Sequence, residues 1–265
     1  MCGQFATGFS RNTVKNWPHI CLKREAPASH PVPRGVPIRE INQFRLICRE
    51  DVKMFVLTIN QRDSKESGDR VEELLETLGD IPALVPFQRS IGDEAIGVVQ
   101  SAHIAVEVAL EAIRERRWHI GIGVGPVEMA EGASINTAEG FGLVYARRAV
   151  NRAQRSTERI PLAVEGPNSE VAAEAEAVLR LIAQIVFTRT DAEWSVLDLM
   201  VPGVRGQQKA IAAALGVSTQ AVSKAISRSF WNEEWACRPA AARLLDLVAG
   251  PTALAPDTLA YNPRD

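Results

Sequence analysis

The sequence predicts an α+β protein in two parts, a ferredoxin-like βαββαβ domain followed by an all-α helix-turn-helix domain. Between residues 54 and 164, short β-prone apolar runs alternate with stretches whose apolar residues recur at helical spacing. After residue 188 only helical spacing remains. In that second part Gly216 separates two short helical patterns, and this spacing is typical of a helix-turn-helix.

The first three strands and the first helix follow from local composition. The run 54–60 (MFVLTIN) is apolar and β-prone, so it predicts a strand. Apolar residues then recur at i, i+3, i+4 and i+7 over residues 68–78, which predicts an amphipathic helix. The runs 83–89 and 95–100 flank a turn at residues 91–94, so we expect a hairpin there.

The remaining elements of this domain alternate in the same way. Helical patterns cover 101–117, with Ser101 as the expected N-cap, then 137–155 and 168–187. Strands are expected at 119–124 and 160–164. The last helical pattern, rich in alanine and glutamate, should close the domain and lead into the next one.

Composition limits the classes of function. The 265 residues carry a net charge of only −2, so any surface that binds nucleic acid must be local. No apolar run approaches the roughly 18 residues of a membrane-spanning helix. The four cysteines (2, 21, 48 and 237) form no CxxC pair, which argues against a zinc site or a disulfide framework. We therefore expect a cytoplasmic protein with reduced thiols and no membrane partner.

The two ends of the chain differ from the rest. Residues 1–53 hold five prolines, lack any sustained period, and carry nine Lys/Arg against four Asp/Glu. They could form a basic arm that helps to hold DNA, or an extension that is disordered or precedes the true start at Met54. We prefer the second interpretation because Met54 opens directly onto a predicted strand. The expected boundaries are 54–187 for the α+β domain, 188–250 for the helix-turn-helix domain, and 251–265 for a flexible tail.

The segment 207–226 has the spacing that two helices crossing at a steep angle require. Gly216 can take the positive φ of a tight turn, and Ala212 is small enough for close approach. Ser218 or Thr219 is expected to cap the second helix. Five residues should form the shared core: Ile211, Leu215, Val217, Val222 and Ala225.

The outward side chains of the second helix are short hydrogen-bonding or cationic groups, with no carboxylate among them. They are Thr219, Gln220, Ser223, Lys224, Ser227 and Arg228. Such groups can read base edges in the major groove and pair with phosphates. We expect Gln207 and Gln208, at the start of the first helix, to contact phosphate. The alternative is a helical hairpin without any role in nucleic-acid binding.

The stretch 190–200 precedes these two helices and resembles the opening helix of bacterial winged or tri-helical regulators. Its Trp194, Leu197 and Met200 should be core residues rather than readers of DNA. We expect Phe230, Trp231 and Trp235 to pack against the same bundle.

Three segments of the first domain resemble the SatD-like family: 57–65 (LTINQRDSK), 90–94 (SIGDE) and 149–155 (AVNRAQR). That family is similar to the class III nucleotide-cyclase and GGDEF catalytic domains. The resemblance covers roughly residues 54–200, and it implies a cyclase-like fold followed by a helix-turn-helix.

The resemblance also implies where metal ions would bind. In active cyclases of this fold, one aspartate on the first strand and one at the hairpin hold two Mg²⁺ ions against a triphosphate. Asp93 matches the hairpin position, but Asn60 stands at the strand position, and Asp63 could replace it only if the chain curls back. The resemblance therefore implies a non-catalytic sensor or dimerisation domain. Arg152 and Arg155 lie where related enzymes contact the nucleotide, although arginines on a surface helix are more often solvated or salt-bridged.

A second glycine pattern, at residues 121–125 (GIGVG), lacks the lysine and hydroxyl residue of a phosphate-binding loop. We interpret it as a strand and turn.

Taken together, the sequence predicts a bacterial transcription regulator that binds double-stranded DNA as a homodimer. The alternative is a nucleotide cyclase or nucleotide-binding switch that uses Asp93, with Mg²⁺ and a nucleotide as ligands. A third possibility is that the first domain binds RNA polymerase or another protein. No cofactor follows firmly from the residues.

Overall fold

The computed structural model describes residues 53–129 and 135–250. The predicted N-terminal extension, apart from residue 53, and the predicted tail lie outside these residues. Within the described chain, contacts separate a larger unit (residues 53–189 and 232–250) from a smaller unit (residues 190–231). The smaller unit thus ends at Trp231, whereas the sequence analysis placed its boundary at residue 250.

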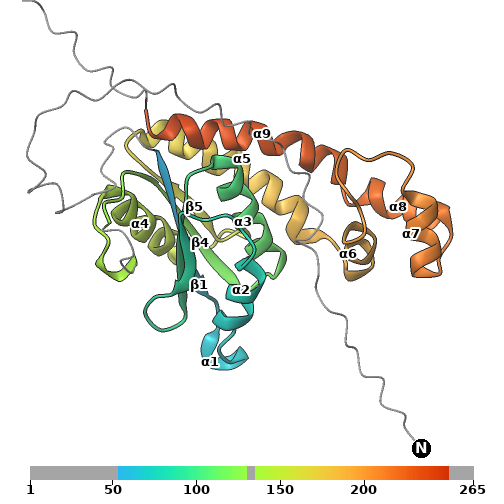
Figure 1. Ribbon diagram of the computed structural model, residues 1–265, viewed down its shortest axis with the longest axis horizontal. Coiled ribbons are helices and arrows are strands. Elements are labelled where there is room, and N and C mark those ends of the chain that lie inside the picture. The colour runs from blue at the N-terminus through green and yellow to red at the C-terminus, as the bar shows by residue number, and fades with distance from the viewer. Residues whose placement is uncertain (1–52, 130–134, 251–265) are drawn as a thin grey trace, which may run out of the picture. The chain divides into compact units, whose positions relative to one another are not determined.

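A five-stranded sheet forms the centre of the larger unit (Figure 1). The strands are β1 (Met54–Gln61), β2 (Val85–Arg89), β3 (Glu94–Val99), β4 (Trp118–Gly125) and β5 (Leu162–Glu165). Their order is β2-β3-β1-β4-β5, with β1 antiparallel to both β3 and β4, and β5 parallel to β4. All five predicted strands are present, and the chain is a mixed α/β protein.

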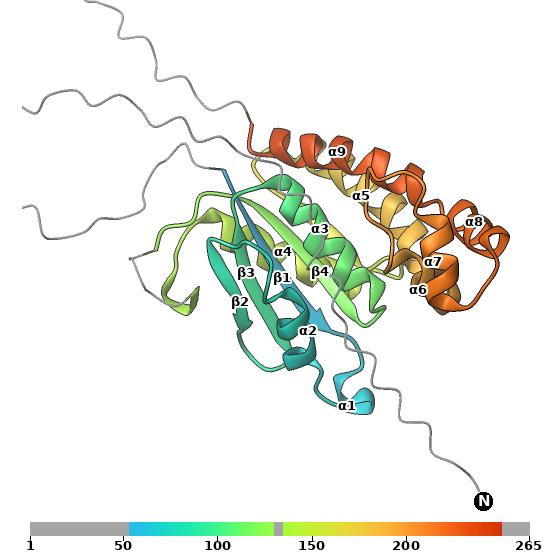
Figure 2. The ribbon, with the colours of Figure 1, turned by 45° about the vertical axis from the view of Figure 1, so that its right-hand side comes forward.

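Helices cover both faces of this sheet. The helices of the larger unit are α1 (Ser64–Ser67), α2 (Val71–Leu78), α3 (Ala102–Arg114), α4 (Phe141–Arg155), α5 (Ser169–Thr188) and most of α9 (Trp231–Val248). Helix α4 packs against β4, β5 and β1 on one face, whereas α3 and α5 contact each other on the opposite face (Figures 1 and 2). Side chains of β1 alternate between these two sides, and all but Asn60 are buried.

The glycines of β4 explain how closely α4 approaches the sheet. A Cβ atom on Gly123 would lie 2.2 Å from the backbone nitrogen of Ala146, and one on Gly121 would lie 2.3 Å from that of Val150. Both distances are far inside van der Waals contact, so only glycine permits this packing. The structure confirms that residues 121–125 are a glycine-bearing strand, and the glycines serve helix packing.

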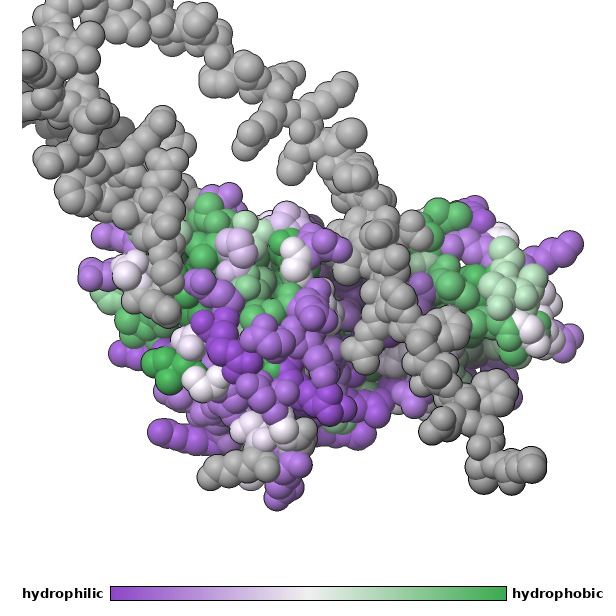
Figure 3. Space-filling view, turned by 60° about the horizontal axis from the view of Figure 1, so that its bottom comes forward, coloured by the Kyte–Doolittle hydropathy of each residue, from purple (hydrophilic) through white to green (hydrophobic). Residues whose placement is uncertain are grey.

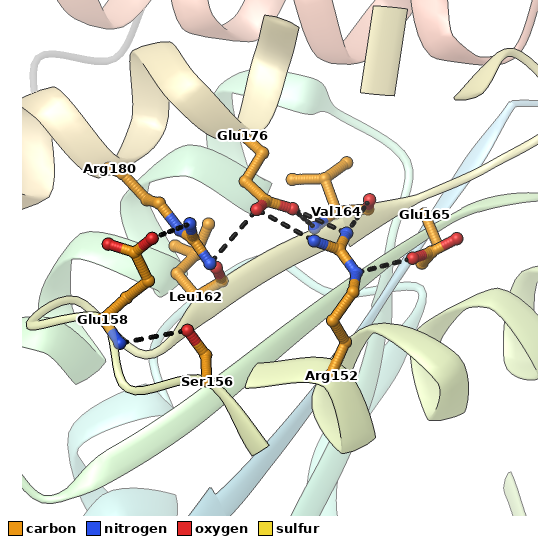
Figure 4. Close-up of polar contacts among 8 residues, drawn as sticks. All are labelled: Arg152, Ser156, Glu158, Leu162, Val164, Glu165, Glu176 and Arg180. Carbon is orange, nitrogen blue, oxygen red and sulfur yellow. Dashed lines mark hydrogen bonds and ion pairs between the residues drawn. The ribbon is translucent and has the colours of Figure 1, made fainter. Parts of the chain in front are cut away.

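Strand β5 is fixed to the helices by a network of charged side chains (Figure 4). The buried carboxylate of Glu176 on α5 accepts two hydrogen bonds from the Arg152 guanidinium, at 2.9 and 2.7 Å, and one from the Val164 backbone N–H at 2.9 Å. Arg180 lies 3.1 Å from the same carboxylate, and Arg152 also pairs with Glu165 at 2.8 Å. Arg152 is therefore a structural ion-pair residue, as one of the two interpretations from sequence held.

Helix α9 belongs mainly to the larger unit because its side chains and its end are held there. Lys53 Nζ donates to the Asp246 carbonyl at 3.0 Å, and the Asn168 N–H donates to the Val248 carbonyl at 3.3 Å. Glu234, with 0 % of its side chain exposed, pairs with Arg189 at 3.2 Å. Figures 1 and 2 show α9 lying along α5. The sequence analysis assigned Trp235 to the other bundle, but its ring contacts Arg238 in the larger unit. The same prediction was wrong for Phe230, which has the left-handed φ of 50° and is 54 % exposed.

Several predicted boundaries shift by a few residues. Helix α4 begins at Phe141, after a separate 3₁₀ turn at Ile135–Thr137, because Gly140 adopts φ 126° and interrupts the helical path. Ser101 stands at the N-cap of α3 as expected, without a side-chain capping bond. None of the helices in the described part of the chain is long and apolar enough to span a membrane.

Candidate nucleic-acid interface

The smaller unit consists of three helices: α6 (Asp191–Leu197), α7 (Gln208–Leu215) and α8 (Thr219–Arg228). Helix α6 starts with a reciprocal capping box, in which the Thr190 hydroxyl accepts from the Glu193 N–H and the Glu193 carboxylate accepts from the Thr190 N–H. Its Val196 and Leu197 are buried, whereas Trp194 and Met200 are half-buried. Of the three residues predicted as core, only Leu197 is fully buried.

Helices α7 and α8 are joined by the tight turn that the sequence predicted. Gly216 adopts φ 66°, ψ 28°, the left-handed conformation, and the Val217 N–H donates to the Ala212 carbonyl at 3.0 Å. One residue later the Ser218 hydroxyl accepts from the Ala221 N–H at 3.1 Å, so Ser218 is the N-cap of α8. The turn therefore consists of only three residues, and it reverses the chain sharply.

The core beneath this turn is small and aliphatic. Ile211, Ala212, Val222 and Ile226 are buried. Leu215 and Ala225 are half-buried, in broad agreement with the predicted core. The prediction was wrong for Val217, which is 45 % exposed. Val217 lies outside both helices and directly follows the left-handed Gly216, so helical periodicity says nothing about the direction of its side chain.

The six residues predicted for the outer face of α8 are all exposed: Thr219, Gln220, Ser223, Lys224, Ser227 and Arg228. Helical spacing places them together because Val222 and Ile226 occupy the opposite side. Within the described residues, only Arg228 of these six has a side-chain ion pair. The other five side chains are available for a partner.

Arg228 lies near a fixed carboxylate. Its Nε is 3.9 Å from Oε1 of Glu193, and 68 % of the Arg228 side chain remains exposed. Glu193 is only 12 % exposed, and its Oε2 accepts from the Thr190 backbone and hydroxyl at 2.9 and 3.1 Å. One carboxylate therefore caps α6 and also lies beside the last cation of α8. The T-x-x-E capping pattern of residues 190–193 was readable in the sequence, but its contact with α8 was not.

The two glutamines at the start of α7 behave differently. Gln208 is exposed, as a phosphate contact requires. The Gln207 amide instead bonds to the preceding loop: its oxygen accepts from the Val201 N–H, and its nitrogen donates to the carbonyls of Val201 and Val204, all within 2.9 Å. We therefore correct the predicted role of Gln207. It stabilises the loop between α6 and α7, because its amide is already satisfied by backbone groups.

All the charged side chains of this pair of helices are cationic. Residues 207–228 include three cations, Lys209, Lys224 and Arg228, and no carboxylate. Lys209 and Lys224 are exposed, like Arg228. A positive surface confined to one segment of a chain with net charge −2 is the pattern expected for a local polyanion contact.

The second predicted site lies at the end of β1 in the larger unit. The structure brings Asn60 and Asp93 together: the Asn60 amide donates to the Asp93 carboxylate at 3.1 Å, and the Gln61 N–H donates to the Asp93 carbonyl at 3.0 Å. His119 is the β4 partner of Asn60, and its Nδ1 is buried without a hydrogen bond from any described residue. Burial lowers the pKa of His119, and Arg62 lowers it further, whereas Asp63 and Asp93 oppose the shift.

These residues do not fit a pair of divalent cations. Two such ions need several carboxylate oxygens, but Asn60 supplies an amide that already donates to Asp93. Asp63 is exposed at the N-cap of α1, in the left-handed conformation with φ 53°. No group of three or more His, Cys, Asp or Glu residues capable of holding a metal occurs among the described residues. The neighbouring Glu94, which the sequence analysis left without a role, is buried and pairs with Arg147 at 2.5 Å.

Comparisons with known proteins give no relationship: no family model, curated protein or solved structure matches this chain.

Proposed function

We propose that the chain is a sequence-specific DNA-binding transcription regulator whose smaller unit is a helix-turn-helix domain. The observation that carries this proposal is the outer face of α8, where five exposed polar or cationic side chains form no hydrogen bond or ion pair with any described residue. Every surface helix has a polar outer face, so what distinguishes α8 is that this face carries cations and no carboxylate. The three-residue turn at Gly216 and the absence of carboxylates from residues 207–228 agree with this function.

In this proposal α8 enters the major groove with its N-terminal turns against the bases. Gln220 and Lys224 lie one turn apart, and their amide and ammonium groups suit adenine and guanine edges respectively. Gln208 and Lys209, at the start of α7, and Arg228, at the end of α8, would contact phosphates on either side. Gln207 acts indirectly, because it fixes the loop that leads into α7.

The larger unit would serve as a sensor or dimerisation domain. Its strand order is the one expected of a ferredoxin-like fold with β5 added at one edge, and this supports the proposed resemblance to SatD-like and cyclase-like domains. A dimer is expected because one recognition helix contacts too few base pairs for selectivity. RNA polymerase or another protein remains a candidate partner of this unit.

The most informative experiment is genome-wide mapping of DNA bound to the chain in its own host. We expect enrichment of a limited set of sites that share a sequence pattern. The control is Lys224→Ala/Arg228→Ala, which removes two exposed cations without touching the core. Loss of enrichment in the control supports the proposal, whereas an identical map for both proteins contradicts it.

The cyclase alternative depends on Asp93, and its donor set is incomplete. Incubation with ATP or GTP and either Mg²⁺ or Mn²⁺ tests it directly. A cyclic or dinucleotide product that disappears with Asp93→Ala would establish the alternative. We expect no such product, because Asn60 cannot provide the second carboxylate.

A further inference from the structure

The outward side of α4 carries exposed apolar residues next to exposed arginines, and the ring centroids of Phe141 and Tyr145 on this helix lie 6.3 Å apart. Phe141 is 65 % exposed and Val144 is 45 % exposed. Arg148 lies four residues after Val144, and Arg155 lies seven residues after Arg148, a spacing that keeps side chains on one face of the helix. On the face drawn in Figure 3, hydrophilic residues predominate and hydrophobic ones gather in patches. Single exposed apolar residues are common, so the charges beside Phe141 and Val144 are what make this stripe unusual.

The four arginines of α4 divide into two pairs. Arg147 and Arg152 are bound to the buried carboxylates of Glu94 and Glu176 within the larger unit. Arg148 and Arg155 are exposed and form no ion pair with any described residue. The two paired arginines thus hold the helix in place, and the other two present positive charge to solvent.

Negative charge lies just before the N-terminal end of α4. Glu128 and Glu139 face each other across an isolated antiparallel bridge, with backbone hydrogen bonds of 2.7 and 2.9 Å, just before α4 begins. Both are exposed, and neither has an ion pair within the described part of the chain. Like charges directly opposite each other destabilise a strand pair, so these two glutamates would gain from a nearby cation.

An acidic segment just before α4, followed by apolar and then basic residues on the outward side of the helix, can make a surface that is complementary to itself. When a second copy lies antiparallel about a twofold axis, Val144 meets Val144 of the other copy. The acidic end of each copy then lies opposite the basic end of the other. This is the isologous arrangement of most homodimers, in which the same patch serves both subunits.

We propose that the outward face of α4, with the Glu128–Glu139 bridge, is the homodimer interface of this protein. The partner is a second copy of the chain, seated antiparallel on the same face. This proposal does not depend on DNA binding, because it concerns only the self-association of the larger unit.

The test is the association state of the full chain, measured by sedimentation equilibrium at low and high salt. We expect a dimer that weakens as salt screens its charges. Val144→Glu should produce a monomer with an unchanged circular dichroism spectrum. The matched control is Leu181→Glu, which places the same charge on an exposed leucine (68 %) of α5 in the same unit and should leave the dimer intact.

Charge reversal identifies the pairing. Glu139→Arg and Arg148→Glu alone should each raise the dimer dissociation constant about tenfold, because each change counts twice across a twofold axis. The double variant should recover most of the original affinity. A monomeric parent chain, a dimer that survives Val144→Glu, or a double variant weaker than both single variants would overturn the proposal.

Discussion

Replacing Gly123 by alanine tests the account of how α4 packs on the sheet. The added Cβ would lie 2.2 Å from the Ala146 nitrogen and 2.3 Å from the Gly142 carbonyl oxygen. Both atoms belong to the helix backbone, so no side-chain rotation can relieve the clash, and the helix must move away from β4. Overpacking a tight core typically costs about 1–3 kcal/mol, and a clash with rigid backbone belongs at the upper limit.

A smaller effect acts in the opposite direction. Alanine reduces the conformational entropy of the unfolded chain relative to glycine, which stabilises a protein by roughly 0.4–1 kcal/mol. We therefore expect Gly123→Ala to lower the free energy of unfolding by about 2 kcal/mol. The matched control is Gly125→Ala in the same strand, where the nearest helix atom, the Gly142 nitrogen, would lie 3.2 Å away. Its cost should be below about 1 kcal/mol, because a shift of a few tenths of an ångström suffices.

Urea denaturation followed by circular dichroism measures both values. Equal stability of the two variants would refute the reasoning, because it would mean that the approach of α4 does not depend on the glycine at position 123.

Three further predictions follow from single contacts. Glu176→Ala should lower the free energy of unfolding by about 2–3 kcal/mol, because Arg152, Arg180 and the Val164 N–H lose their shared acceptor. The control Glu165→Ala removes one partly exposed partner of Arg152 and should cost less than about 1 kcal/mol. Equal losses of unfolding free energy in urea titrations of the two variants would contradict this ranking. Burial beside Glu234 raises the pKa of Glu107 from 4.5 to about 7 against the opposing effect of Arg238, so the folded state binds this proton more tightly, and stability should fall as the pH rises from about 4.5 through 7. At pH 8, Glu107→Gln should be more stable than the parent chain by an amount of order 2 kcal/mol, and this difference should disappear near pH 5. If the melting temperatures of the two proteins change with pH in the same way, the effect is excluded. Gly216→Ala should destabilise the turn between α7 and α8 by about 1 kcal/mol, because alanine disfavours the left-handed backbone conformation at this position. No atom lies within 4 Å of the added Cβ, so no steric clash contributes. The measurement is amide hydrogen exchange, which should become faster in α7.

Local pattern was sufficient for the elements that bury one face. Alternation and apolar runs identified all five strands, and helical spacing identified α2 to α8 apart from boundary shifts, because these residues face a core directly. The same pattern placed Gly216 in the turn and the six polar residues on the outer face of α8.

Contacts between segments that are distant in the sequence could not be predicted from local patterns. Gln207 binds a loop whose path is fixed by Gly203 and Gly206, both with positive φ, and no periodicity reveals that path. Helix α9 joins the larger unit through Glu234 and Arg189, which are 45 residues apart. The glycines of β4 were recognised as part of a strand, but their role became clear only when α4 was placed against them.

The central claim is tested most directly by fluorescence anisotropy with duplex DNA from the chain's own genome, titrated over a series of salt concentrations. The account predicts an association constant whose logarithm falls linearly with the logarithm of salt concentration. Lys224→Ala/Arg228→Ala should bind more weakly and should reduce the slope by about two. Binding that is absent or insensitive to salt, or a double variant indistinguishable from the parent chain, would contradict the claim that α8 contacts DNA.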